Sequence, residues 1–180
     1  MEIIQFIIKQ NGHFPNSALP LLLYKNVLKL PDGKSEEIIT GIFTDNNWSN
    51  IWTNGIYPYH HYHSNTHEVL GIISGECVVL LGGEKGIQCT LTKGDVIIIP
   101  AGVAHKSVSA SDDFKCAGAY PDGKEYDIKY GSNGEQQAAE ESIQRVPLPD
   151  SDPVYGKQGP LFEYWKKAAP APKRTGTGTK

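Results

Sequence analysis

The sequence has few cysteines, little net charge and no long apolar run. Its three cysteines lack the spacing of a zinc finger or a Cys-X-X-Cys motif, so disulfides are not expected. A net charge of −3 gives no indication of a nucleic-acid partner. No apolar run is long enough to cross a bilayer, and Glu2 stands where a secretory signal is basic. We therefore expect a cytoplasmic globular protein that binds neither nucleic acid nor a membrane.

The length of 180 residues is typical of one domain with its own hydrophobic core. We expect this domain to span residues 1–165. Within it, prolines and glycines interrupt residues 146–165 while apolar side chains recur between them, which predicts an extended arm packed on the outside of the domain. Residues 166–180 are basic and of low complexity, and we expect a disordered tail there.

Most of the chain consists of short runs rich in β-branched and aromatic residues, separated by Gly, Pro, Asn and Asp. Many short strands at near-regular spacing predict an all-β sandwich or barrel. Residues 35–44, with Ser35 as an N-cap, and residues 135–145 have helical patterns instead, and we predict a short peripheral helix at each. The predicted strands are 3–9, 21–27, 51–57, 59–63, 68–74, 77–81, 87–91, 95–100, 105–110 and 114–120.

A histidine-rich segment in the middle of the chain carries the residues best suited to bind a metal. Residues two apart in an extended strand point to the same face, so we expect His61 and His63 to point together. Glu68 follows a polar stretch that predicts a turn, and a returning strand would bring its carboxylate beside the two imidazoles. His105, after a Pro-X-Gly turn, is a fourth candidate. Three imidazoles and one carboxylate make a mixed nitrogen and oxygen site for a divalent transition metal.

These four residues belong to two ordered motifs that resemble those of the cupin superfamily. The first motif reads Gly55, five residues, His61-X-His63, four residues, Glu68, six residues, Gly75. The second reads Gly94, five residues, Pro100-X-Gly102, two residues, His105. In one respect the chain departs from the family, because Ser109 stands where an asparagine is usual.

The cupin resemblance covers the motif core, residues 55–109. It implies a double-stranded β-helix, the jelly-roll barrel of cupins, with His61, His63, Glu68 and His105 as the metal ligands. The wider chain is also similar to the YjlB-like group of uncharacterised single-domain bacterial cupins. That similarity rests on the tyrosine- and histidine-rich run 57–64, on residues 67–71 and on residues 152–156 in the arm.

Several neighbouring side chains are candidates for substrate binding. Tyr57 and Tyr59 share the strand parity of the histidines that follow them, so we expect both to line the barrel, or to pack in its core. The Tyr59 hydroxyl is a candidate catalytic group that could donate to a substrate oxygen. Ser107 and Ser109 share the parity of the third histidine, and small polar groups there would leave room for a ligand.

Two further histidines and two tryptophans are not expected to belong to the site. His60 and His67 alternate in parity with the candidate ligands and should point away from the site. Trp48 and Trp52 are expected to be packing residues.

Four protein ligands also bear on the choice of metal. They would saturate a tetrahedral zinc, whereas octahedral iron, manganese or nickel would keep two positions for substrate or dioxygen. We therefore expect one divalent metal, with iron or manganese favoured over nickel or zinc.

The leading hypothesis for function is a metal-dependent, dioxygenase-like enzyme acting on a small oxygen-rich molecule. A metal-dependent isomerase or decarboxylase, and a non-catalytic metal or small-molecule binding or sensor protein, remain open, because one fold hosts all of these. The cupin resemblance, together with flat outer sheets, also predicts a homodimer.

Overall fold

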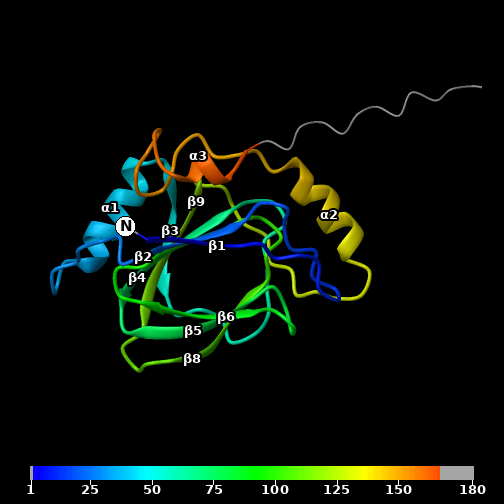
Figure 1. Ribbon diagram of the computed structural model, residues 1–180, viewed down its shortest axis with the longest axis horizontal. Helices are drawn as coiled ribbons and strands as arrows, with labels where there is room; N and C mark the ends of the chain where they lie inside the picture. The colour runs from blue at the N-terminus through cyan, green and yellow to red at the C-terminus, as the bar shows by residue number, and fades with distance from the viewer. Residues whose placement is uncertain (1, 167–180) are drawn as a thin grey trace, which may run out of the picture.

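Two antiparallel sheets face each other across a barrel (Figure 1). The computed structural model describes residues 2–166, so the predicted tail over residues 166–180 lies, apart from Lys166, outside the described residues. The larger sheet has the strand order β1-β2-β7-β4-β9-β3, and the smaller sheet has the order β6-β5-β8. This architecture confirms the predicted all-β class and is that of a double-stranded β-helix.

The described part of the chain contains nine strands and three helices. None of these helices has the length and apolar character needed to span a membrane. The strands are β1 (Glu2–Phe6), β2 (Leu21–Lys25), β3 (Trp48–Asn54), β4 (Glu68–Ser74), β5 (Glu76–Leu81), β6 (Ile87–Thr92), β7 (Val96–Ile99), β8 (His105–Ala110) and β9 (Lys115–Pro121). The helices are α1 (Ser35–Asp45), α2 (Gln136–Arg145) and α3 (Leu161–Tyr164).

One predicted strand is wrong. Residues 59–63 form only isolated bridges, because adjacent residues in the segment pair with different partners. His61 exchanges backbone hydrogen bonds with His105, while Tyr62 exchanges them with Lys129. The segment is therefore paired with β8 through His61 and with the loop after β9 through Tyr62.

The two predicted helices are present, but the predicted cap is wrong. Lys34 occupies the N-cap of α1 without a side-chain hydrogen bond, and Ser35 lies in the first turn. The Ser35 hydroxyl instead donates to the carbonyl oxygen of Pro31 at 3.3 Å. The short helix α3 was not predicted; it begins directly after Pro160, whose fixed φ suits a helix start.

The inner strands of the larger sheet, β2, β7, β4 and β9, are buried on both faces because their side chains alternate between two hydrophobic cores. On β2, Leu21 and Leu23 belong to the core inside the barrel, whereas Leu22 and Tyr24 belong to the core outside it. A strand that is covered on both faces has no polar side, and this accounts for the unbroken apolar run from Leu21 to Tyr24.

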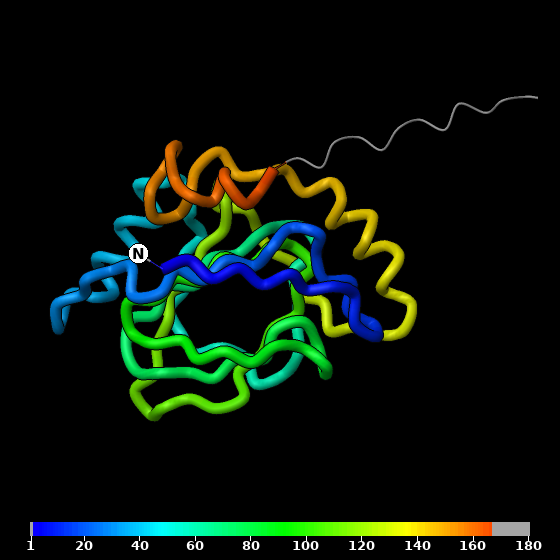
Figure 2. The backbone as a smooth tube through the Cα atoms, viewed as in Figure 1, coloured from blue at the N-terminus to red at the C-terminus, as the bar shows by residue number. Residues whose placement is uncertain are grey.

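The outer core is covered by α1 and by the arm. Helix α1 packs directly on β4 at Gly71, where a Cβ atom would lie 2.6 Å from Ile39 Cγ2 and 2.9 Å from Phe43 Cζ. Figure 2 shows the arm crossing the same side of the barrel as α1. Two indole nitrogens anchor it: Trp48 Nε1 donates to the carbonyl oxygen of Ser151 at 2.9 Å, and Trp165 Nε1 to that of Pro20 at 2.8 Å.

Asp152 holds the arm together and ties it to the sheet. Its side chain is buried and accepts hydrogen bonds only. Its Oδ1 accepts from the backbone N–H groups of Val154 and Tyr155 at 2.8 and 3.0 Å. Its Oδ2 accepts from the Tyr24 hydroxyl at 2.7 Å and from the backbone N–H of Leu161 at 3.1 Å. A carboxylate suits this position because all four partners are donors.

Asp152→Asn should lower the free energy of unfolding by about 1–3 kcal/mol, because the amide NH₂ would face donors in a buried site. Urea unfolding monitored by tryptophan fluorescence measures the change. Asp150→Asn, at an exposed position two residues earlier, is the matched control and should leave stability unchanged. Equal stabilities for the two variants would show that the arm does not depend on this carboxylate.

Candidate metal centre

Backbone hydrogen bonds bring the three candidate histidines together. His105 N donates to the His61 carbonyl at 2.9 Å, and His61 N donates to the His105 carbonyl at 3.2 Å. Gly102 N donates to the His63 carbonyl at 2.8 Å. Gly102 has a φ of +95°, a conformation that L side chains rarely adopt, so the glycine of the Pro-X-Gly turn permits this contact. Residues more than forty apart in sequence thus meet at one end of the barrel.

Each of the three imidazoles has its Nδ1 against a backbone carbonyl. A carbonyl oxygen only accepts, so Nδ1 carries a proton, and Nε2 of the neutral imidazole keeps a lone pair. The carbonyl belongs to Tyr59 for His61 (3.1 Å), to Asp127 for His63, and to Val103 for His105 (3.0 Å). One ring nitrogen from each histidine lies within 4.8 Å of the others. The fold therefore selects the tautomer that binds metal through Nε2.

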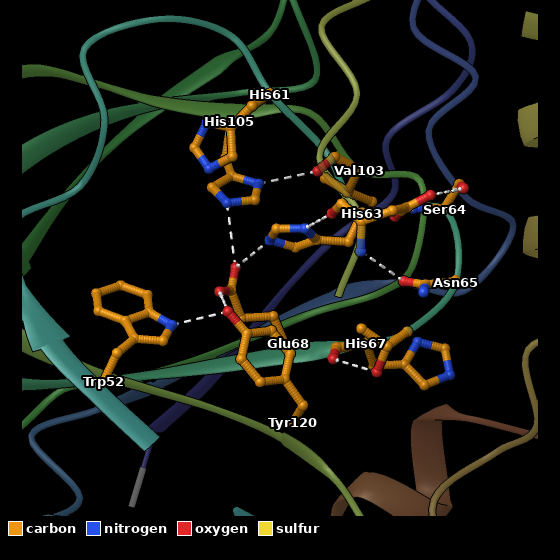
Figure 3. A network of polar contacts seen from close by, with 12 residues as sticks. Trp52, His61, His63, Ser64, Asn65, His67, Glu68, Val103, His105 and Tyr120 are labelled. Atoms are coloured by element: carbon orange, nitrogen blue, oxygen red, sulfur yellow. Dashed lines mark hydrogen bonds and ion pairs between the residues drawn. The ribbon is translucent and has the colours of Figure 1, made fainter. Parts of the chain in front are cut away.

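Glu68, the first residue of β4, adds a carboxylate to this group (Figure 3). Its Oε2 lies 3.2 Å from His105 Nε2 and 3.4 Å from His63 Nε2. These are ion-pair distances, yet buried Oε2 accepts no aligned hydrogen bond within the described chain. A single proton on one of the facing nitrogens can join it to the carboxylate, whereas a divalent ion would bring both nitrogens and the carboxylate oxygen together.

The pKa values follow from burial and from this carboxylate. Burial, with repulsion from His105, lowers the pKa of His61 to about 3, so this imidazole is neutral. Burial also opposes charge on His63 and on Glu68, but their mutual attraction outweighs it. The pKa of His63 is raised as a result, and the pKa of Glu68 lies well below its usual value. An ionised carboxylate beside neutral imidazole is the donor set that divalent iron, manganese, nickel or zinc binds.

A chain of two donors orients the Glu68 carboxylate. Trp52 Nε1 donates to the Tyr120 hydroxyl oxygen at 2.7 Å, and that hydroxyl donates to Glu68 Oε1 at 2.7 Å. Burial, together with the Glu68 charge, raises the pKa of Tyr120 far above its ordinary value, so the phenol keeps its proton. Gly118 lies opposite Trp52 on the neighbouring strand, where a Cβ atom would lie 2.5 Å from the indole nitrogen. With Oε1 occupied, Oε2 is left to face the histidines.

A cavity of about 300 Å³ reaches this group. Besides the four candidate ligands, its wall is partly aromatic and partly aliphatic. The lining residues are Trp52, Thr53, Asn54, Gly55, Ile56, Tyr57, Pro58, His61, His63, Glu68, Leu70, His105, Tyr120, Tyr126 and Ile128. Its size lies at the lower end of the range for small-molecule sites.

The four predicted substrate-binding residues differ in whether they line the cavity. Tyr57 lines the cavity, whereas Tyr59 does not and stacks on Tyr57 with ring centroids 4.9 Å apart. Neither Ser107 nor Ser109 lines it, so their predicted position is wrong. Ser107 Oγ lies 3.4 Å from the sulfur of Cys77, and Ser109 is exposed. Ser107 keeps the register of His105 and faces the inner core beside Cys77, away from the cavity. Ser109 follows a β-bulge in β8, where the register shifts and the strand parity is lost.

His60 and His67 lie away from the cavity, as their parity predicts. His60 Nε2 lies 3.2 Å from a Glu84 carboxylate oxygen. His67 accepts from the backbone N–H of Ala101 at 3.0 Å through Nδ1, and its Nε2 donates to the Pro147 carbonyl at 3.1 Å. Burial lowers the pKa of His67 to about 4, so it is a neutral link between the barrel and the arm.

Sequence reasoning missed the residues that follow Gly118. Tyr120 orients Glu68, Tyr126 lines the cavity, and the Asp127 carbonyl fixes His63. The Asp127 carboxylate also accepts from the backbone N–H of Ser64 at 2.7 Å, which ties the loop after β9 to the histidine segment. None of these residues lies in a motif, and only the pairing of β9 with β3 and β4 brings them to the site.

The cupin domain family matches residues 48–117. The uncharacterised protein YjlB of Bacillus subtilis (strain 168) is 45% identical over 167 residues, which cover 92% of this chain and 98% of YjlB.

Among solved structures, acireductone dioxygenase from Bacillus anthracis, with a cadmium ion in its active centre, is 18% identical with a TM-score of 0.39. That match covers 59% of this chain and 80% of the enzyme. An 11S globulin from Wrightia tinctoria, described with an auxin binding site, is 15% identical with a TM-score of 0.36. There the match covers 44% of this chain but only 22% of the globulin. Likenesses at this level carry no information about activity.

Tyr120→Phe should weaken the apparent affinity for a divalent metal by about 10- to 100-fold, because the Glu68 carboxylate loses the donor that orients it. Competition with a chromophoric chelator measures this affinity. Tyr126→Phe is the matched control, since its ring stacks on Tyr120 at 4.5 Å and no described hydrogen bond joins it to Glu68. If both variants hold metal as tightly as the wild type, the hydrogen bond from Tyr120 has no orienting role.

Proposed function

The chain belongs to the cupin family as a YjlB-like member, and on that premise we propose that it binds one divalent metal through His61, His63, Glu68 and His105. The observation that carries the proposal is the unpartnered oxygen of Glu68. It is buried, and it faces imidazole nitrogens whose protons are held on the opposite side of each ring. Iron or manganese is our first choice, because the carboxylate makes the donor set harder than one of imidazoles alone.

We further propose that the site is catalytic and that the reaction is of the dioxygenase type, on a small oxygen-rich molecule. The cavity supports this, because it gives a ligand of limited size access to the four donors. When bound, iron or manganese supplies a Lewis acid for substrate oxygens and can activate dioxygen. The protein's own part is to hold the donors in place and to surround the substrate with apolar walls formed by Trp52, Ile56 and Leu70.

Of the two tyrosines that precede the histidines, Tyr57 is the better placed to contact a substrate. Its ring forms part of the cavity wall, whereas Tyr59 stacks behind it. We therefore propose Tyr57 as a substrate-binding residue and assign Tyr59 the role of supporting it.

A non-catalytic metal or small-molecule binding protein is the second candidate. It is favoured by the cavity wall, where the described residues include no acid or base other than the four ligands and the tyrosines. The same observation argues against an isomerase or a decarboxylase that moves a proton, because such a reaction needs a positioned acid or base.

We also propose that the protein is a cytoplasmic homodimer. The three free cysteines support a reducing compartment. Figure 1 shows no helix over the sheet formed by β6, β5 and β8, and the edge strands of that sheet carry the exposed side chains of Ile87 and Val108. Light scattering at micromolar concentration measures the assembly directly.

Metal content should depend on the proposed ligand residues and not on their neighbours. Protein purified without a nickel column should load one metal ion per chain, and chelation should lower its melting temperature, because metal binds only the folded state. Glu68→Gln keeps the side-chain shape but removes the charge, and it should lose most of the metal. His60→Gln is the matched control for His61→Gln and should keep it. Loss of metal from the His60 variant alone would show that His60, and not His61, is a ligand.

Oxygen uptake separates the catalytic role from the binding role. Iron-loaded protein should consume dioxygen when offered enediols, catechols or related small oxygen-rich compounds, and Glu68→Gln should abolish the uptake. An oxygen electrode follows the reaction. Metal-loaded protein that binds such compounds without any oxygen uptake would favour the non-catalytic role.

A further inference from the structure

The wall of the cavity has a distinct chemistry. Trp52, Tyr57, Tyr120 and Tyr126 contribute aromatic surface, and the remaining apolar wall is aliphatic. Among the described residues that line the cavity, none is a lysine or an arginine. The negative charge of Glu68 therefore has no lysine or arginine beside it on the wall. Beyond the proposed metal, a phosphate or another strongly anionic group would find no cationic side chain here.

Two of these tyrosines stand beside the candidate ligands and are partly open to solvent. Tyr57 is 48% exposed, and its ring meets that of His61 edge-on at 76°, with centroids 5.3 Å apart. Tyr126 is 38% exposed and meets His63 edge-on at 67°, with centroids 5.0 Å apart. One exposed ring thus accompanies each of two ligand histidines.

Both rings are supported from behind. Tyr57 stacks on Tyr59 at 4.9 Å with an interplanar angle of 15°. Tyr126 stacks on Tyr120 at 4.5 Å with an angle of 24°. Rings held in this way lose little freedom when a ligand packs against them, so they form a wall that is ready to bind a flat partner.

We propose that the ligand of this site is a planar aromatic molecule with two adjacent oxygen donors and without a phosphate or comparable anionic group. The oxygens are directed to the metal, and the ring packs against Tyr57 and Tyr126. This assignment rests on the proposed function, because the metal is what binds the two oxygens. It narrows the substrate from any small oxygen-rich molecule to one class.

Two hydroxamic acids test the aromatic wall without requiring turnover. Acetohydroxamate and benzohydroxamate present the same pair of oxygens to a metal and differ in a methyl or a phenyl group. Calorimetry on metal-loaded protein should show benzohydroxamate binding at least about tenfold more tightly, as expected for a buried ring. The same metal held by nitrilotriacetate gives the preference of the metal alone. A third probe, benzohydroxamate with a para phosphonate, should lose this advantage.

Alanine variants test which tyrosines contact the phenyl ring of the probe. Tyr57→Ala and Tyr126→Ala should each reduce the preference for the phenyl probe by roughly 3- to 10-fold while leaving acetohydroxamate binding unchanged. Tyr130→Ala is the matched control: Tyr130 is 52% exposed, contacts the Tyr59 ring and does not line the cavity. Metal content is measured for every variant, so that a lost ligand preference is not confused with a lost metal.

The possible results are distinct. A loaded wild-type protein that binds the two simple hydroxamates equally, or prefers the phosphonate, would overturn the aromatic assignment alone. Equal effects of Tyr57→Ala and Tyr130→Ala would do the same. A protein that takes up no metal would overturn the proposed function, and this inference with it.

Discussion

The rest of the site depends on one electrostatic constraint: the charge of a buried carboxylate must be compensated within a small volume. The Nε2 atoms of His63 and His105 lie 3.4 and 3.2 Å from an oxygen of Glu68, and all three residues are buried, so water does not compensate this charge. Burying such groups without a compensating partner is costly. A divalent cation removes this cost, and the backbone carbonyls that hold each Nδ1 proton ensure that a lone pair is offered to it.

The fold meets this requirement by holding the strand that carries Glu68 rigidly in place. Glu68 begins a strand whose two neighbours in the larger sheet are β7 and β9; Glu68 itself pairs with Ile99 of β7, and pairing with β9 starts at Val69. The sheet is in turn packed between an inner and an outer core, and α1 and the arm cover the outer one. A donor that is fixed before binding loses little entropy when a metal arrives, and this is the advantage of placing Glu68 on a strand that is buried on both faces.

The alternating strand pattern predicted the fold class, and two ordered motifs predicted the four candidate ligands. Two-residue spacing placed His61 and His63 on one side even though their segment is not a regular strand. The same parity rule failed for Ser109, since a β-bulge is not visible in the pattern of apolar residues. Tyr120, Tyr126 and Asp127 could not be found at all. They reach the site through strand pairing and a loop, which depend on contacts between distant parts of the chain.

Anomalous scattering from a crystal loaded with manganese or iron locates the metal directly. One strong peak is expected at bonding distance, about 2.0–2.2 Å, from the Nε2 atoms of His61, His63 and His105 and from Oε2 of Glu68. Oε1 should keep its hydrogen bond from Tyr120. A peak bound through Nδ1 atoms or through His60, or a saturated crystal with no peak among these four atoms, would contradict this set of ligands.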